Sequence, residues 1–327
     1  MKVSSFDGSV TKEGLQSFND FAATLRPGES NLGNEWAQGH SGEHTKAMGL
    51  VYQLVGQQAT LDQMLRFCDA VLSQRNDLTK SPMGQHKVWT GRIDPAWPNN
   101  VTANPIVTGG EQGDPVEHLA NCAYLILKTG SLRSQKVTIG DPHRYGATYM
   151  DRAKTYLQEA DFAISNHILS SLLDLSGGNK MYFAKDSPYM GGKPVPWNQQ
   201  MMFNYAFMNL CGAHRILKDN PKLLVKPAGG GGGSNHGSLD VAGFYRAYID
   251  GNYAITADRM KPFANTFVDV MTLGDKKWAG RVNGESARGH ASSTLHRERL
   301  SVPACQYVRI IDLSCLTTPS RVDSLAM

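Results

Sequence analysis

Residues 197–217, WNQQMMFNYAFMNLCGAHRIL, are the stretch that decides the expected fold, and residues 116–128, VEHLANCAYLILK, share their character. Both are apolar nearly all round, and a helix of that kind must be covered on every side. By contrast, residues 61–76 and 148–174 repeat apolar side chains at spacings of three and four, which predicts helices with one polar face. This alternation predicts two layers, with an inner ring of helices inside an outer ring.

Toroids of helical hairpins, the (α/α)n barrels, are built from two such rings. We therefore expect a mainly α chain that forms an (α/α)n toroid, complete or incomplete, with few short strands, most of them after about residue 275. A chain of 327 residues is long enough to bury a sizeable core. We expect residues 1–327 to form a single domain, with a flexible linker at the five consecutive glycines 229–233.

Charge and hydropathy limit the classes of partner. The chain has 33 basic and 29 acidic residues and no basic run, so we expect no nucleic-acid partner. No stretch approaches the roughly 18 consecutive apolar residues of a membrane span, so we expect no membrane partner. The start, MKVSSFDGSV, lacks the apolar core of a signal peptide. We expect a secreted protein whose leader is absent from this chain.

The cysteines and one histidine motif raise the question of metal binding or cross-linking. Cys68, Cys122 and Cys211 lie in apolar helical patterns, where cysteine acts as a small hydrophobe, and the spacing of the five cysteines is not of a metal-binding type. A local bridge between the other two cysteines, Cys305 and Cys315, stays open.

The run His40-Ser41-Gly42-Glu43-His44 fits the inverted zinc-peptidase signature, with Glu117 as a third ligand. However, Gly39 and Gly42 argue against a helix there, so we interpret the run as a loop that enters a helix near Glu43. We expect no metal.

Two polar segments carry side chains suited to sugars. The long loop 81–115 contains aromatic rings beside hydrogen-bonding groups, and residues 196–200, PWNQQ, repeat that chemistry at the start of an inner helix. Flat aromatic faces stack on sugar rings, while arginine and amide groups bind hydroxyls and carboxylates. The expected substrate-binding residues are Trp89, Arg92, Trp97, His118, Trp197, Asn198 and Gln199.

A further polar run, residues 111–118, opens the other inner helix and has two interpretations. Its carboxylates could supply the acid and the base of an inverting glycosidase. Alternatively, Asp114 is an N-cap with Pro115 at the first helical position and Glu117 in the first turn.

Asn235 and His236 follow the glycine run and precede an amphipathic helix with Ser238 as its expected N-cap. Tyr245 and Tyr248 lie on the apolar face of that helix. An imidazole and an amide at a helix mouth suit acid–base chemistry. The alternative is that Asn235 and His236 are turn residues and that both tyrosines face the core.

These runs, with residues 259–267, RMKPFANTF, and 278–284, WAGRVNG, resemble the alginate-lyase-like toroidal polysaccharide lyases, and most closely polysaccharide lyase family 38. The resemblance is one of pattern and layout over roughly residues 115–285. It implies a lyase that cleaves a uronic-acid polymer of the glucuronan or alginate type by β-elimination, without a cofactor. Its partner would be an anionic polysaccharide.

The resemblance matches Asn235 and His236 to the family's Asn-His pair. In such lyases the uronate carboxylate is neutralised, for which Asn235 and Arg281 are suited, because the C5 proton is otherwise too weakly acidic to leave. His236 suits the base. Ser238 stands where the family often has a tyrosine, so Tyr245 or Tyr248 would deliver the proton. The alternatives are a glycoside hydrolase on the same scaffold and a non-catalytic glycan-binding protein.

Overall fold

The computed structural model describes residues 11–100, 103–176, 181–218, 245, 248, 256–265, 272–274 and 277–278. The chain divides into two compact units, Thr24–Gly229 and a second made of Met1–Ala23 with Gly230–Met327. The boundary falls at the glycine run that the sequence predicts as a linker, although residues 229–233 themselves lie outside the described residues. The single domain stays a prediction.

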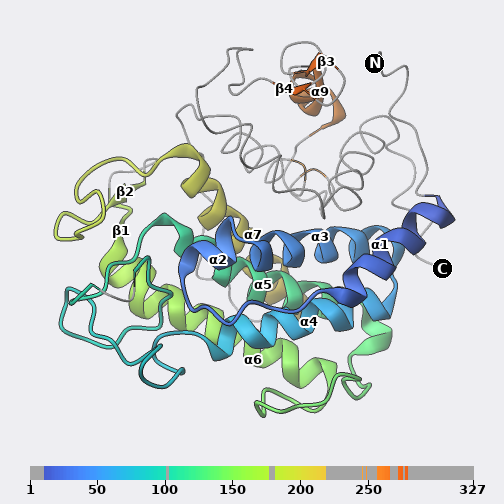
Figure 1. Ribbon diagram of the computed structural model, residues 1–327, viewed down its shortest axis with the longest axis horizontal. Helices are drawn as coiled ribbons and strands as arrows, with labels where there is room; N and C mark the ends of the chain where they lie inside the picture. The colour runs from blue at the N-terminus through green and yellow to red at the C-terminus, as the bar shows by residue number, and fades with distance from the viewer. Residues whose placement is uncertain are drawn as a thin grey trace. The chain divides into compact units, whose positions relative to one another are not determined.

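The larger unit is mainly helical, which confirms the predicted fold class at that level (Figure 1). Its helices are α2 Gly33–Ala37, α3 His40–Val55, α4 Gln58–Ser73, α5 Gly113–Lys128, α6 Tyr149–Ala163 and α7 Trp197–Leu217, with 3-10 turns η1 Gly110–Gln112 and η2 Gly130–Leu132, and a π-helix, η3 Ile164–Leu172. Two short antiparallel strands, β1 Leu173–Asp174 and β2 Tyr182–Phe183, pair Leu173 with Phe183. These strands lie well before the region where the sequence predicted them.

The other unit has fewer described elements. Helix α1, Lys12–Thr24, begins the described chain, and α9 spans Ala257–Asn265. Strands β3 Thr272–Gly274 and β4 Lys277–Trp278 pair antiparallel, close to the region where the sequence predicted strands.

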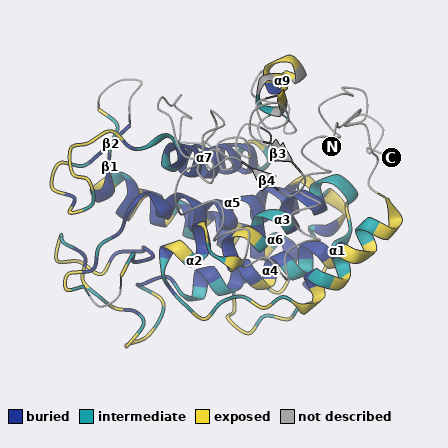
Figure 2. Cartoon of the chain, turned by 45° about the horizontal axis from the view of Figure 1, so that its top comes forward, coloured by how far each residue is buried: buried dark blue, intermediate teal, exposed yellow. Residues whose placement is uncertain are grey.

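Helix α5 is the centre of the larger unit, in contact with α7, α6, α3 and α4 (Figures 1 and 2). It is buried from Gly113 to Leu127, and α7 is buried nearly throughout from Asn198 to Ala213. The predicted burial of these two helices is therefore confirmed. The two helices approach closely at glycines: a Cβ on Gly113 would lie 2.6 Å from the Met202 carbonyl carbon, and one on Gly212 would lie 2.7 Å from the Tyr124 ring.

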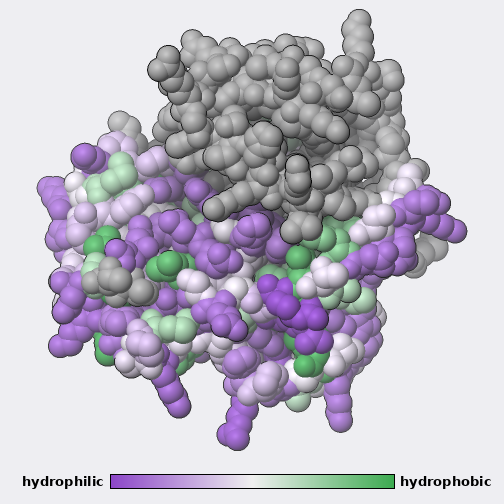
Figure 3. Space-filling model, viewed as in Figure 1, coloured by the Kyte–Doolittle hydropathy of each residue, from purple (hydrophilic) through white to green (hydrophobic). Residues whose placement is uncertain are grey.

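The predicted amphipathic helices α4 and α6 both pack against α5. Along α6 the exposed residues Asp151, Lys154 and Gln158 recur at spacings of three and four and form the polar face that the sequence predicts. Helix α4 is more deeply covered, and within residues 61–76 only Arg66 is exposed (Figure 2). The coloured residues of the face seen in Figure 3 are mostly hydrophilic, with scattered apolar residues among them. In the described chain, no helix is long and apolar enough to cross a membrane.

Three local predictions are wrong. Helix α3 begins at His40 rather than near Glu43, with Gly39 as its N-cap. Gly42 does not break the helix but lets its first turn pack against the Trp36 carbonyl oxygen, which a Cβ at this position would overlap. Asp114 is not an N-cap but lies inside the first turn of α5, where it binds Lys46 at 2.6 Å. Cys68 and Cys122 are not independent hydrophobes: they form a disulfide between α4 and α5. Cys211 is buried and not disulfide-bonded, as expected.

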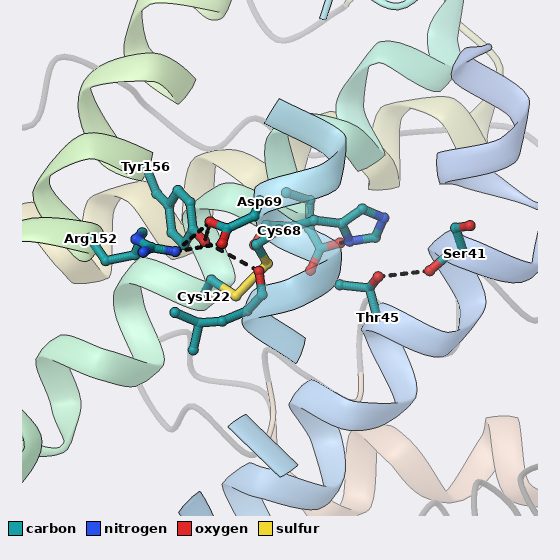
Figure 4. Close-up of a disulfide and its surroundings, with 10 residues drawn as sticks. Ser41, Thr45, Cys68, Asp69, Cys122, Arg152 and Tyr156 are labelled. Carbon is teal, nitrogen blue, oxygen red and sulfur yellow. Dashed lines mark hydrogen bonds and ion pairs between the residues drawn. A yellow bond between two sulfur atoms is a disulfide. The ribbon is translucent and has the colours of Figure 1, made fainter. Parts of the chain in front are cut away.

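A buried ionic cluster lies beside this disulfide (Figure 4). Arg152 of α6 donates to both oxygens of Asp69 on α4, at 2.6 and 2.5 Å, and Tyr156 donates to Asp69 at 2.5 Å. The remaining guanidinium hydrogens bind Asp141 at 3.0 Å and the carbonyls of Gly140 and Gly146. All the donors of Arg152 are thus used, which suits a charged group with no exposed surface.

Candidate functional site

A polar site of the larger unit lies where α5 and α7 begin. It consists of Asn99, Glu111, Tyr189 and Gln199, which we call the cradle, and comes from two loops, η1 and the first turn of α7. These groups can approach one another because Gly109 and Gly110, which lie between them, have no side chains. A Cβ on Gly109 would lie 2.8 Å from the Tyr189 ring, and one on Gly110 would overlap Gln199.

Glu111 is the acid of the cradle. Its side chain is almost fully buried, and its Oε1 accepts from the Gly109 N–H at 2.9 Å and from Gln112 Nε2 at 3.4 Å. Burial raises the pKa of Glu111 despite these hydrogen bonds, which lower it, because a carboxylate loses its hydration there. Glu111 can therefore keep its proton at a pH where an exposed glutamate has lost it.

Tyr189 and Gln199 form the opposite side. Gln199 Nε2 donates to the Tyr189 hydroxyl at 2.7 Å, and burial raises the pKa of Tyr189, so the phenol stays neutral. Its own proton has no acceptor among the residues that the structure describes.

Two buried acceptors of the cradle are also unused. In the described structure, Gln199 Oε1 and Asn99 Oδ1 have no hydrogen-bond partner. An unpaired buried polar atom costs about 1–3 kcal/mol, so each needs an explanation. Two free acceptors, a free phenolic proton and a protonatable carboxyl group are the set that a hydroxyl-rich ligand would satisfy.

Two expected binding residues belong to the core instead. Trp97 is fully buried, and its indole N–H donates to the Val71 carbonyl at 2.9 Å, so it has no face free to stack on a sugar. His118 is also fully buried, with Nε2 2.6 Å from the Trp36 carbonyl oxygen and Nδ1 2.8 Å from Glu117. The structure places both side chains in the core, and their roles in substrate binding stay predictions.

Trp89 and Arg92 lie in the same loop but nearer the surface. Trp89 is half-buried, with its ring edge-on to His167 at 5.7 Å between centroids, and its indole N–H has no acceptor in the described chain. The Arg92 side chain is 55% exposed, and it binds Asp94 at 3.1 Å and Ser171 at 2.8 Å. Their roles in binding stay predictions.

Trp197 and Gln199 are half-buried, and Asn198 is buried, all in the first turn of α7. Of these three expected binding residues, Gln199 belongs to the cradle. Of the expected catalytic residues, Asn235, His236 and Arg281 lie outside the described residues, as does Ser238. Tyr245 is buried and Tyr248 is half-buried, with ring centroids 6.3 Å apart.

The two other carboxylates of the run 111–118 lie close to side chains of the protein itself. Asp114 binds Lys46 at 2.6 Å, and Glu117 lies 2.8 Å from the His118 Nδ1. His40 and His44 do lie one turn apart on α3, with ring centroids 5.9 Å apart. Within the described ranges, however, no three histidine, cysteine or acidic side chains are grouped to hold a metal ion.

The sequence did not single out Tyr189. Its only signal was the length and glycine content of the loop before α7, which is typical of loops with a function. Comparison with known proteins adds no further guide: no protein-family model, curated protein or solved structure matches this chain.

Proposed function

We propose that this chain is a secreted carbohydrate-active enzyme on an (α/α) toroid scaffold, and that it cleaves a uronic-acid polymer of the glucuronan or alginate type by β-elimination. The observation that supports carbohydrate binding is the cradle, with its two unused buried acceptors beside the Tyr189 hydroxyl and the Glu111 carboxyl group. Sugar hydroxyls both donate and accept, so they can pair with both kinds of group.

The lyase chemistry itself comes from the sequence resemblance. In this proposal Asn235 and Arg281 neutralise the uronate carboxylate, His236 removes the C5 proton, and Tyr245 or Tyr248 protonates the leaving oxygen. The buried helical centre formed by α5 and α7 is compatible with the inner ring of a toroid. A disulfide between Cys68 and Cys122 is in keeping with secretion, because such bonds persist in oxidising compartments.

One screen tests the proposal. The protein is incubated with glucuronan, alginate and neutral polysaccharides, and the ultraviolet absorbance is followed, since β-elimination creates an absorbing unsaturated uronate. Rising absorbance with a uronate polymer supports the lyase, and His236→Ala should then lower turnover by about 10²- to 10⁴-fold. No absorbance change with any uronate polymer would refute it.

The cradle is tested separately. Tyr189→Phe removes one hydroxyl and should weaken binding of an active polymer about tenfold, as expected for a buried hydrogen bond of roughly 1.4 kcal/mol. The matched control is Tyr182→Phe, a half-buried tyrosine of β2 outside the cradle. Equal affinities for both variants would remove the cradle from the proposal.

A glycoside hydrolase is the second candidate, and the raised pKa of Glu111 favours it, since a general acid must be protonated near the working pH. In the same screen, hydrolysis would release new reducing ends without absorbance. Binding without either product would identify a non-catalytic glycan-binding protein.

A further inference from the structure

Three buried residues outside the cradle form a continuous hydrogen-bonded array. His167 Nδ1 lies 2.9 Å from Asp94 Oδ2, and its Nε2 lies 2.7 Å from the Thr108 hydroxyl. Thr108 and His167 have no exposed surface and Asp94 has 3%. The array joins two points of the loop between α4 and α5 to the π-helix η3, and π-helices occur frequently at functional sites.

The direction of each hydrogen bond follows from the charge of Asp94. Burial by itself raises the pKa of Asp94, but hydrogen bonds from His167 and Arg92 outweigh burial and lower it. An ionised carboxylate only accepts, so His167 Nδ1 must carry a hydrogen. In the tautomer with its hydrogen on Nδ1, the Nε2 lone pair accepts the Thr108 hydroxyl proton.

This array ends at Thr108, three residues before Glu111 of the cradle. The residue after Thr108 is Gly109, whose N–H holds Glu111 Oε1 at 2.9 Å and whose Cα hydrogen points at the Tyr189 ring. A shift of Thr108 would therefore move the contacts of both Glu111 and Tyr189.

We propose that Asp94, His167 and Thr108 position the Gly109 turn, and through it the acid and the tyrosine of the cradle. His167 is a positioning residue that does not touch the ligand. The inference rests on the proposed ligand-binding role of the cradle, but its first test does not depend on that role.

The test compares Thr108→Val, which removes the hydroxyl and keeps the shape, with Thr108→Ser, which keeps the hydroxyl. We expect hydrogen exchange of the Gly109 amide to accelerate about tenfold in Thr108→Val and less than about threefold in Thr108→Ser, since local opening reports local stability. The amides of Leu119 and Ala123 in the middle of α5 serve as references and should not change. Unchanged Gly109 exchange in Thr108→Val would overturn the proposal, as would equal acceleration in both variants or along α5.

Asp94→Asn is the second variant, in case Thr108→Val does not fold. An amide can donate to His167 Nδ1 and favour the other tautomer, in which Nε2 carries the hydrogen and no longer accepts from Thr108. We expect the same faster exchange at Gly109, and exchange as in the wild type would contradict the array. If the protein proves active, Thr108→Val should lower kcat about tenfold and change KM less than about twofold, the split expected when positioning is lost. An inactive wild type would refute the lyase and leave the exchange result to decide the array.

Discussion

The ionic cluster around Arg152 and the cradle around Glu111 are both buried and polar, but they differ in how completely their groups are paired. Every donor of Arg152 has an acceptor, and burial, which would lower its pKa, is outweighed by Tyr156 and Asp69, which raise it. In the cradle, two acceptors and one phenolic proton are unused within the described structure. A saturated cluster stabilises the native state, whereas an unsaturated one costs stability, and on the proposed function a bound ligand would offset that cost.

The largest effect is expected in the saturated cluster. Arg152→Met keeps much of the side-chain volume but leaves Asp69 buried without its cation, which should lower the free energy of unfolding by about 3–5 kcal/mol. Denaturant unfolding measures it. Arg66→Met, at an exposed position on the same helix as Asp69, is the control and should stay within about 0.5 kcal/mol of the wild type. A loss below about 1 kcal/mol for Arg152→Met would show that the Arg152 cluster does not stabilise the native state.

The disulfide beside this cluster should have the next largest effect. Cys68 and Cys122 are separated by 54 positions, and opening a loop of that length should lower the free energy of unfolding by about 2–4 kcal/mol. Unfolding of the Cys68→Ala/Cys122→Ala double variant measures the loss. Cys211→Ala serves as control for removing a buried cysteine that is not cross-linked. Free thiols at both positions in the purified, non-reduced protein would contradict the bond.

The next prediction concerns Glu111→Gln in the cradle and the dependence of stability on pH. Because the folded protein raises the pKa of Glu111, it holds a proton that the unfolded chain releases near pH 4.5. Wild-type stability should therefore fall as pH rises above that value, by up to about 1.4 kcal/mol per pH unit until the folded pKa is passed.

Glu111→Gln lacks this loss, so its stability advantage over the wild type should grow with pH through the same window. Denaturant unfolding at several pH values measures the difference. Glu29→Gln, at an exposed glutamate, should instead follow the wild-type curve. Parallel curves for Glu111→Gln and the wild type would show that Glu111 is ionised in the folded protein.

The smallest effect is expected at Trp197. Trp197→Ala should weaken binding of uronate oligosaccharides about fivefold, since an aromatic platform contributes roughly 1 kcal/mol, and the melting temperature should hardly change. Trp197→Phe keeps an aromatic face and should retain most of the affinity. Calorimetric titration measures both. A large loss of melting temperature with unchanged affinity would make Trp197 a packing residue.

The helical class and the burial of α5 and α7 were predictable from the local spacing of apolar residues. A helix that is apolar all round must be buried. The expectation of accessible side chains was not met at Trp97 and His118. Trp97 lies among polar neighbours, and His118 ends the polar run 111–118 inside a helix that is otherwise apolar. The structure buries both, with hydrogen bonds to the carbonyls of Val71 and Trp36. Those partners are 26 and 82 residues away along the chain, so no local pattern could indicate them.

The period of the apolar residues in the sequence determines which segments are helical and which helices are buried. Tertiary structure alone decided that Cys68 meets Cys122, that Arg152 of α6 meets Asp69 of α4, and that Tyr189 lies beside Gln199. The physical reason is range. Helix periodicity is a property of neighbouring residues, whereas the pairing of a buried polar group depends on which distant segment packing brings within about 3 Å of it.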